Sequence, residues 1–156
     1  MKNDILVRLK GVTKKYGNVT AADNVNLTIS RGEFLVLLGP SGSGKTTILS
    51  MMGGFTVPTS GQIIIDGEDV TETPPALRPT VTVFQDYALF PHMSVLENVS
   101  FGLAMQKVPK AARYKRAEEC IDTVGLTGYG DRGIHQLSGG QRQRVALARA
   151  IAVEPA

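Results

Sequence analysis

The sequence contains 156 residues, of which 17 are Lys or Arg and 14 are Asp or Glu, so its formal net charge is +3. An apolar fraction of 42% with 20% charged residues excludes a disordered tail or a collagen-like chain and indicates about one globular domain. The small positive charge permits contact with anions without requiring a nucleic acid. The single cysteine, Cys120, excludes an internal disulfide framework and is typical of a reducing compartment.

The first 40 residues predict three strands. Apolar and polar residues alternate over 5–9 and 25–29, which is typical of half-buried strands, and a turn near Gly17 would pair them antiparallel. Phe34–Leu38 is a continuous apolar run between two glycines and predicts a central strand covered on both faces. This run is far shorter than the roughly 20 apolar residues that span a bilayer, and no secretory signal precedes it. We therefore expect a soluble chain, or one attached to a membrane through a partner.

The segment after this strand matches a phosphate-binding pattern. Residues Gly39–Thr46 read G-x-x-x-x-G-K-[ST] in full, and a helix is predicted directly afterwards, over 45–52. The glycines let successive backbone N–H groups turn inward around anionic oxygens, and the positive end of the helix dipole points at the same place. Lys45 supplies a mobile cation for the outer phosphates, and the Thr46 hydroxyl can ligate Mg²⁺. The strand–loop–helix context distinguishes this loop from an ordinary glycine-rich turn.

The second half of the chain is predicted to be helical. Ser94 and Glu97 have the spacing of a capping box and open one helix. A second helix ends at Gly125. A third opens with another capping box, at Ser138 and Gln141, and ends before the final proline. Two further short strands are expected in the first half, over 63–65 and 81–84.

The third helix begins with an unusual run, Leu137–Gln141, of sequence LSGGQ. One interpretation is an ordinary capping box with a glycine-rich approach. However, two glycines in a first helical turn cost about 1 kcal/mol each relative to alanine. A chain tolerates that cost where a ligand must come close to bare backbone. The run therefore indicates a second set of exposed N–H groups, with the Ser138 hydroxyl, suited to another phosphate.

The phosphate loop, then Val83–Gln85, then the run from Leu137 to Ala150, in this order, make the sequence resemble the ATP-binding cassette (ABC) ATPases. The resemblance covers essentially the whole chain. It implies an α/β fold with a P-loop NTPase core, an N-terminal antiparallel β subdomain and an α-helical insertion. Within a single domain over 1–156 it implies three parts: a β subdomain and P-loop core over 1–90, a helical subdomain with the Q-loop link over 91–137, and the signature helix over 138–156.

The resemblance also implies roles for individual residues. Tyr16 falls where the family stacks an aromatic ring on adenine, with simple packing beside a turn as the alternative. Gln85 resembles the Q-loop glutamine, a Mg²⁺ ligand and sensor of the γ-phosphate, and Lys45 is the catalytic residue present. The implied ATP-binding residues are Tyr16, Gly39, Pro40, Ser41, Gly42, Ser43, Gly44, Lys45, Thr46, Thr47 and Gln85, with Thr46 and Gln85 holding Mg²⁺. The signature residues Leu137, Ser138, Gly139, Gly140 and Gln141 would contact ATP bound to a second subunit.

The implied function is that of an ATP-binding subunit that couples ATP binding and hydrolysis to solute import through a membrane permease. The segment Asp86–Met93 is most similar to polyamine and iron importers. The implied partners are a second ATPase subunit in a head-to-tail dimer, the permease and, indirectly, a solute-binding protein, with no nucleic acid. The expected location is the cytoplasm, on the inner face of the cell membrane through the permease.

Two sets of side chains near these motifs allow more than one interpretation. Tyr87, Leu89 and Phe90 are apolar residues on an expected loop, so they are candidates for the permease interface or for packing of the helical insertion. Arg142 and Arg149 lie seven residues apart on the signature helix. They are expected to share one face, which adds positive potential near the signature or is simply solvated.

The sequence ends before the apolar strand that in this family terminates in Asp-Glu, the Walker B segment whose residues hold Mg²⁺ and polarise the attacking water. The chain is therefore expected to be a truncated cassette that binds nucleotide and does not turn it over efficiently alone. Two alternatives remain open: a non-transport ABC ATPase acting on DNA or the ribosome, and a nucleotide-binding but catalytically incomplete fragment.

Overall fold

The computed structural model describes residues 4–155, and the chain divides into two compact units, one up to Thr80 and one from Val81 to Pro155. Each unit has an apolar core of its own. The domain expected over 1–156 begins and ends at residues outside the described range. The division after residue 80 precedes the expected end of the β subdomain at residue 90, and the signature helix lies in the same unit as the other long helices.

The first unit contains a four-stranded antiparallel sheet with the strand order β2-β1-β3-β4. The strands are β1 (Ile5–Tyr16), β2 (Val19–Ser30), β3 (Ser60–Ile65) and β4 (Glu68–Asp69). In the centre of the sheet Leu9 lies opposite Leu27 on one side and Ile63 on the other. The hairpin predicted from the alternating residues is confirmed, and its pairing reaches Tyr16 and Val19 on either side of the turn.

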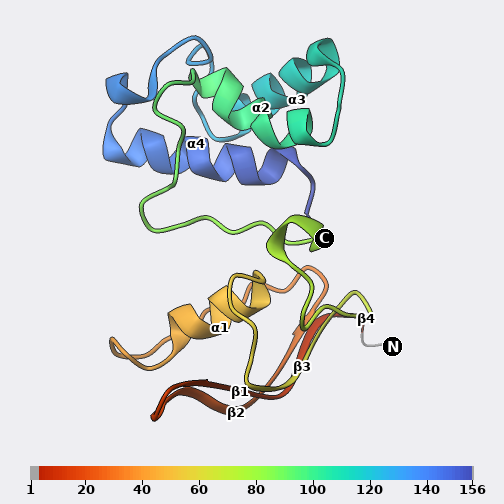
Figure 1. The fold of residues 1–156 in the computed structure, drawn as a ribbon. Coiled ribbons are helices and arrows are strands. Elements are labelled where there is room, and N and C mark those ends of the chain that lie inside the picture. The colour runs from red at the N-terminus through yellow and green to blue at the C-terminus, as the bar shows by residue number, and fades with distance from the viewer. Residues whose placement is uncertain (1–3, 156) are drawn as a thin grey trace. The chain divides into compact units, whose positions relative to one another are not determined.

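The helix α1 (Lys45–Met52), which lies beside the sheet of the first unit (Figure 1), is confirmed as predicted. Its buried Met51 packs into the core of that unit. This core consists of Val7, Leu9, Val12, Ala22, Met51, Ile63, Ile65 and Val70. The C-terminal end of α1 is held by Arg78, which follows a short 3-10 helix (Pro75–Leu77). The buried Arg78 guanidinium donates to the carbonyls of Met51 (2.7 Å) and Met52 (2.9 Å) and to two carbonyls outside the helix. Its buried charge is thus compensated by backbone acceptors.

Two strand predictions are wrong for the described structure. Phe34–Leu38 has no regular secondary structure, and the Phe34 and Leu38 side chains are 90% and 88% exposed. Val81–Phe84 is likewise irregular, with Val81 and Phe84 more than 40% exposed. An extended segment becomes a strand only when a neighbouring strand accepts and donates its backbone hydrogen bonds. Among residues 4–155 no strand pairs with either segment.

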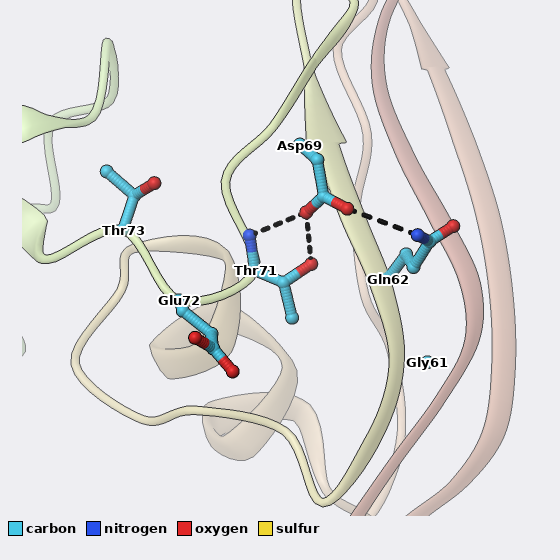
Figure 2. A pocket seen from close by; sticks show the side chains of 6 residues that line it. All are labelled: Gly61, Gln62, Asp69, Thr71, Glu72 and Thr73. Carbon is cyan, nitrogen blue, oxygen red and sulfur yellow. Dashed lines mark hydrogen bonds between the residues drawn. The ribbon is translucent and has the colours of Figure 1, made fainter.

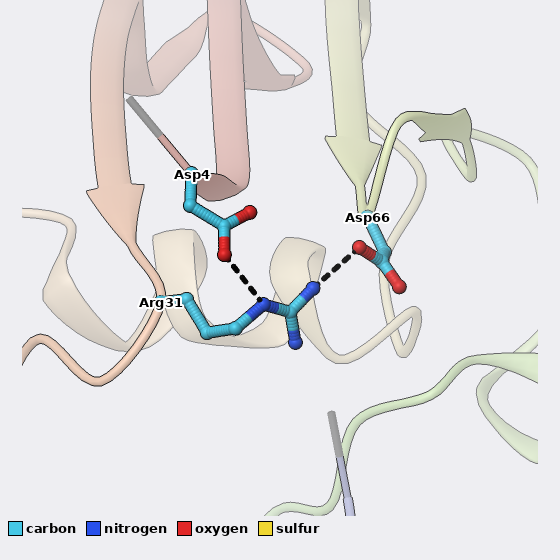
Figure 3. Close-up of polar contacts among 3 residues, drawn as sticks. All are labelled: Asp4, Arg31 and Asp66. Atoms are coloured by element: carbon cyan, nitrogen blue, oxygen red, sulfur yellow. Dashed lines mark hydrogen bonds and ion pairs between the residues drawn. The ribbon is translucent and has the colours of Figure 1, made fainter. Parts of the chain in front are cut away.

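A surface ion cluster lies where the start of β1 and the ends of β2 and β3 come together. Figure 3 shows Arg31, which follows β2, between two carboxylates. Its Nε lies 3.2 Å from Asp4 Oδ2, and its Nη2 lies 2.6 Å from Asp66 Oδ1 in the β3–β4 turn. All three side chains are exposed, so we expect each pair to contribute about 0–1 kcal/mol to stability.

The second unit consists of three mutually packed helices, α2 (Val95–Met105), α3 (Lys110–Thr123) and α4 (Gly139–Ala152), with a 3-10 helix (Ile134–Gln136) before α4. The three predicted helices are therefore confirmed. Their shared core consists of Val95, Val99, Leu103, Ala117, Cys120, Ile121, Leu126, Ile134, Leu137, Val145, Ala148 and Ala152. Burial in this core raises the pKa of the Cys120 thiol, which makes the thiol a packing group with little reactive thiolate.

The capping box that opens α2 is confirmed. The Ser94 hydroxyl accepts from the Glu97 N–H (3.2 Å), and the Glu97 carboxylate accepts from the Ser94 N–H (2.8 Å). One turn later the buried Asn98 binds the backbone of Phe90 at both its N–H (2.8 Å) and its carbonyl (3.1 Å). The Asn98 side chain thereby fixes the end of the loop that leads into α2. Within residues 4–155 no helix is both long enough and apolar enough to cross a membrane.

Candidate functional site

The segment 39–44 forms a loop that leads into α1. Part of this loop and the first turn of α1 border a cavity of about 420 Å³. The lining residues are Ala21, Ser41, Gly42, Ser43, Gly44, Lys45, Thr46 and Thr47. Gly44, the N-cap of α1, has φ +89°, and a Cβ there would lie 2.3 Å from the carbonyl oxygen of Ala21 in β2. Only glycine tolerates both the positive φ and the close approach of the Ala21 carbonyl. The tight approach of β2 to this glycine sets the entry of the chain into α1.

The cation of Lys45 lies over the loop. Its Nζ donates to the carbonyls of Gly39 (2.7 Å) and Pro40 (2.6 Å) and lies 3.1 Å from Ser43 Oγ. In the described part of the chain no carboxylate forms an ion pair with this ammonium group. The first turn of α1 contains no acidic residue and no side-chain cap, so the positive end of the helix dipole is not neutralised there.

These groups match the chemistry of a polyphosphate. The cavity is lined by first-turn backbone, a lysine and the hydroxyl residues Thr46 and Thr47, and no acidic residue is among the described residues that line it. Its volume is in the range of ordinary small-molecule sites. Phosphate oxygens require N–H donors and a cation, while a hydroxyl group such as that of Thr46 is a suitable Mg²⁺ ligand. The loop therefore fits an anionic ligand with its counter-cation.

A larger cavity, of about 560 Å³, lies beside β3 and β4 and has the opposite character (Figure 2). Asp69 accepts there from the Thr71 hydroxyl and N–H and from Gln62, and the bonds from Thr71 lower the pKa of its carboxyl. Glu72 adds a second carboxylate to the wall. An anionic wall repels phosphate, so charge rather than size selects the loop cavity as the candidate site.

Tyr16 is placed at the end of β1, paired with Val19, and its ring is 51% exposed. The ammonium of Lys14 lies 5.1 Å from the ring centroid. An exposed ring with one face toward a cation is available for stacking. Tyr16 is not among the described residues that line the loop cavity, and its adenine-stacking role stays a prediction.

Gln85 belongs to the second unit and is exposed at the start of a turn in which the Tyr87 N–H donates to the Phe84 carbonyl (3.0 Å). Its role as a Mg²⁺ ligand stays a prediction. The apolar residues that follow are half-buried: Leu89 packs against the helical core, and the Phe90 ring lies 4.5 Å from that of Phe101. This arrangement favours packing of the helical unit over a free apolar interface for Leu89 and Phe90.

Arg149 does not have the environment expected from its spacing to Arg142. Its guanidinium donates to the carbonyls of Ala88 (2.7 Å) and Tyr87 (2.8 Å), and partial burial lowers its pKa. Arg149 is therefore bound to the turn after Gln85 rather than simply solvated, and its contribution to the positive potential near the signature stays a prediction. The contact joins residues 61 and 62 positions apart, and no local sequence signal indicates it.

The signature residues form the N-terminus of α4. The Ser138 hydroxyl accepts from the Gln141 N–H (3.3 Å), and the Gln141 side chain accepts from the Ser138 N–H (2.9 Å), which confirms the predicted capping box. The other end of the Gln141 amide donates to the Tyr129 hydroxyl (3.3 Å). A Cβ added at Gly139 or Gly140 would meet nothing within 4 Å. The first turn of α4 thus presents bare backbone outward, while Leu137 is buried in the core.

Residues 22–156 match the ABC transporter family. The chain belongs to this family. The spermidine/putrescine import ATP-binding protein PotA of Nitrosomonas eutropha is 54% identical over 150 residues, covering 96% of this chain and 41% of that protein. The Fe(3+) ions import ATP-binding protein FbpC of Pasteurella multocida is 55% identical over 153 residues, covering 98% of this chain and 44% of that protein. The chain thus spans less than half the length of these two curated relatives.

Solved structures of ABC cassettes share the fold. The dimeric structure of the cassette MJ0796 in a post-hydrolysis state bound to ADP and Pi has a TM-score of 0.85 at 40% identity, covering 96% of this chain and 71% of that one. A second dimeric structure of MJ0796 has a TM-score of 0.86 at 39% identity, with the same coverage. The α/β fold class and the ABC family expected from the motifs are confirmed.

Proposed function

We propose that this chain is the ATP-binding part of an ABC importer subunit and binds ATP with Mg²⁺ at the loop before α1. The observation that supports this most directly is the pairing of the Lys45 cation with the uncapped first turn of α1 at a cavity free of described acidic residues. Lys45 would bind the outer phosphates and the loop N–H groups the remaining phosphate oxygens. Thr46 would hold the metal ion, for which Gln85 stays a predicted second ligand. A metal ion held there would neutralise developing charge on the phosphates.

The bare first turn of α4 supports a second part of the proposal. Ser138, Gly139 and Gly140 bind the terminal phosphate of ATP held by a second copy, so that two chains associate head to tail around nucleotide. The dimeric form of the related MJ0796 cassette supports this arrangement. Hydrolysis needs a carboxylate beside the attacking water, and none is among the described residues that line the loop cavity. We therefore expect this chain by itself to bind ATP with little turnover.

The names of the relatives support import of a polyamine or of Fe(3+) as the cellular role, with a membrane permease as partner and the cytoplasmic face of the membrane as location. Co-purification distinguishes this role from a non-transport ABC ATPase. Recovery of a membrane permease with the tagged protein supports the importer role. Recovery of DNA or ribosomes without a permease contradicts it.

The nucleotide site is tested by equilibrium binding of a fluorescent ATP analogue in the presence of Mg²⁺. We expect Lys45→Ala to raise the Kd about tenfold or more, because a charge-assisted contact to phosphate is worth roughly 1.5–3 kcal/mol. The control is Lys115→Ala, which removes an exposed lysine from the middle of α3 and should leave the Kd unchanged. Equal affinity of the Lys45→Ala and Lys115→Ala proteins would show that the loop is not the site.

A further inference from the structure

The turn that follows Gln85 has an unusual backbone. Tyr87 and Ala88 are consecutive non-glycine residues with φ values of 65° and 44°. The left-handed region crowds a Cβ against the neighbouring carbonyl, so ordinary residues adopt it rarely and seldom twice in succession. Such a conformation persists only where surrounding contacts stabilise it. The question is which contact in this unit does so.

The side chain of Arg149 contacts the backbone of both left-handed residues. One end of its guanidinium fork, Nη2, donates to the Tyr87 carbonyl (2.8 Å), and the other, Nη1, donates to the Ala88 carbonyl (2.7 Å). The same guanidinium lies 5.5 Å from the centroid of the Phe90 ring. A planar group with fixed donors matches two carbonyls at once, and a cationic donor strengthens both bonds. These bonds favour the left-handed backbone conformation of Tyr87 and Ala88.

Two different helices hold this segment. Asn98 on α2 binds the N–H and the carbonyl of Phe90, which fixes the end of the segment. Arg149, near the C-terminus of α4, fixes its middle. The same helix begins at Gly139, directly after the signature serine. The donors that hold the middle of the turn and the signature residues therefore lie on one helix, α4.

We infer that Arg149 is a positioning residue that holds the turn after Gln85 in its left-handed conformation and couples that turn to the signature helix. The inference rests on the proposed function, because it links the segment carrying the proposed Mg²⁺ ligand to the segment proposed to contact a second nucleotide.

The first measurement is hydrogen–deuterium exchange of the peptide that covers residues 84–90, in the whole chain. We expect Arg149→Met to accelerate exchange of the Tyr87 amide at least tenfold, and Arg149→Lys to have an intermediate effect because an ammonium cannot span both carbonyls in one plane. The matched control is Arg144→Met. Arg144 also extends from α4 to two successive carbonyls, but those belong to Val124 and Gly125 after α3. It should leave exchange over 84–90 unchanged.

The second measurement is rescue. Glycine adopts the left-handed region without steric cost, so Ala88→Gly added to Arg149→Met should return exchange over 84–90 toward the native rate. In the same proteins the gain in ATP-analogue affinity on adding Mg²⁺ should fall in Arg149→Met and recover in the double variant. General destabilisation would not be repaired by a glycine in a loop, because glycine also raises the entropy of the unfolded chain.

The inference is overturned if Arg149→Met leaves exchange over 84–90 at the native rate. It is equally overturned if the acceleration spreads evenly over α2, α3 and α4, or if Ala88→Gly restores neither exchange nor the Mg²⁺ effect. The Lys45→Ala comparison separates this result from the proposed function. If that variant binds the analogue normally, the nucleotide site is wrong, whereas the exchange comparison still decides whether Arg149 holds the turn.

Discussion

The N-termini of α1 and α4 are both glycine-rich, but for different reasons. At α1, Gly44 is required by the chain itself, since its φ is +89° and a Cβ would collide with the Ala21 carbonyl. At α4, Gly139 and Gly140 are in ordinary helical geometry with open space where a Cβ would be. A glycine that the fold demands says little about ligands. A glycine that the fold does not demand, kept at a cost in helix stability, indicates a surface that must stay bare for another molecule.

The caps differ in the same way. The first turn of α1 has no side-chain cap, and Lys45 folds back onto the loop carbonyls. The first turn of α4 is closed by Ser138 and Gln141, which satisfy each other's backbone N–H groups. Because the Ser138 hydroxyl accepts from Gln141, its own hydrogen is left to donate outward. The uncapped N-terminus of α1 thus lines a cavity within its own unit. The N-terminus of α4 is already capped, and its first turn is exposed.

The largest effect that tests this comparison is expected for Gly44→Ala. Left-handed strain and a backbone collision together should lower the free energy of unfolding by about 3 kcal/mol, and ATP-analogue binding should be lost with the loop geometry. Urea unfolding measures the first quantity. The control is Gly42→Ala, which has φ +80° but open space around the Cβ and should cost only about 1 kcal/mol. If both variants lowered the free energy of unfolding equally, a collision with the Ala21 carbonyl would not explain the glycine at position 44.

A smaller effect is expected for Ser138→Ala. Loss of the cap should lower the free energy of unfolding by about 1 kcal/mol, and it should also weaken association driven by ATP and Mg²⁺, measured by sedimentation velocity. Ser94→Ala removes the equivalent cap from α2 and should cost the same in stability with no effect on association. If both variants affect association alike, the first turn of α4 has no special role.

The smallest effect on stability, and of opposite sign, is expected for Gly140→Ala. Alanine in an unobstructed helical position should raise the free energy of unfolding by up to about 1 kcal/mol. Association with ATP and Mg²⁺ should nevertheless weaken, because a methyl group would cover backbone proposed to face phosphate. A variant that is more stable and still associates normally would contradict the contrast drawn between the two helix ends.

The strand predictions show where local pattern stops being sufficient. The hairpin of β1 and β2 is confirmed because its two strands are neighbours in the chain, and the starts of α2 and α4 are confirmed because each capping box lies within four consecutive residues. Phe34–Leu38 carries an equally clear strand pattern and forms no strand among the described residues. A central strand forms only when strands on both sides hydrogen-bond to it. Its apolar pattern alone therefore does not decide whether it forms.

The sequence by itself determined the phosphate loop, the capped start of α4 and the family, because each is a short run whose chemistry depends on residues within a few positions of one another. Only the tertiary structure decided that Arg78 hydrogen-bonds to the end of α1 and that Arg149 hydrogen-bonds to the turn after Gln85. Both arginines bind backbone carbonyls. A carbonyl belongs to every residue type, so no side-chain pattern identifies it as a partner until the chain has folded.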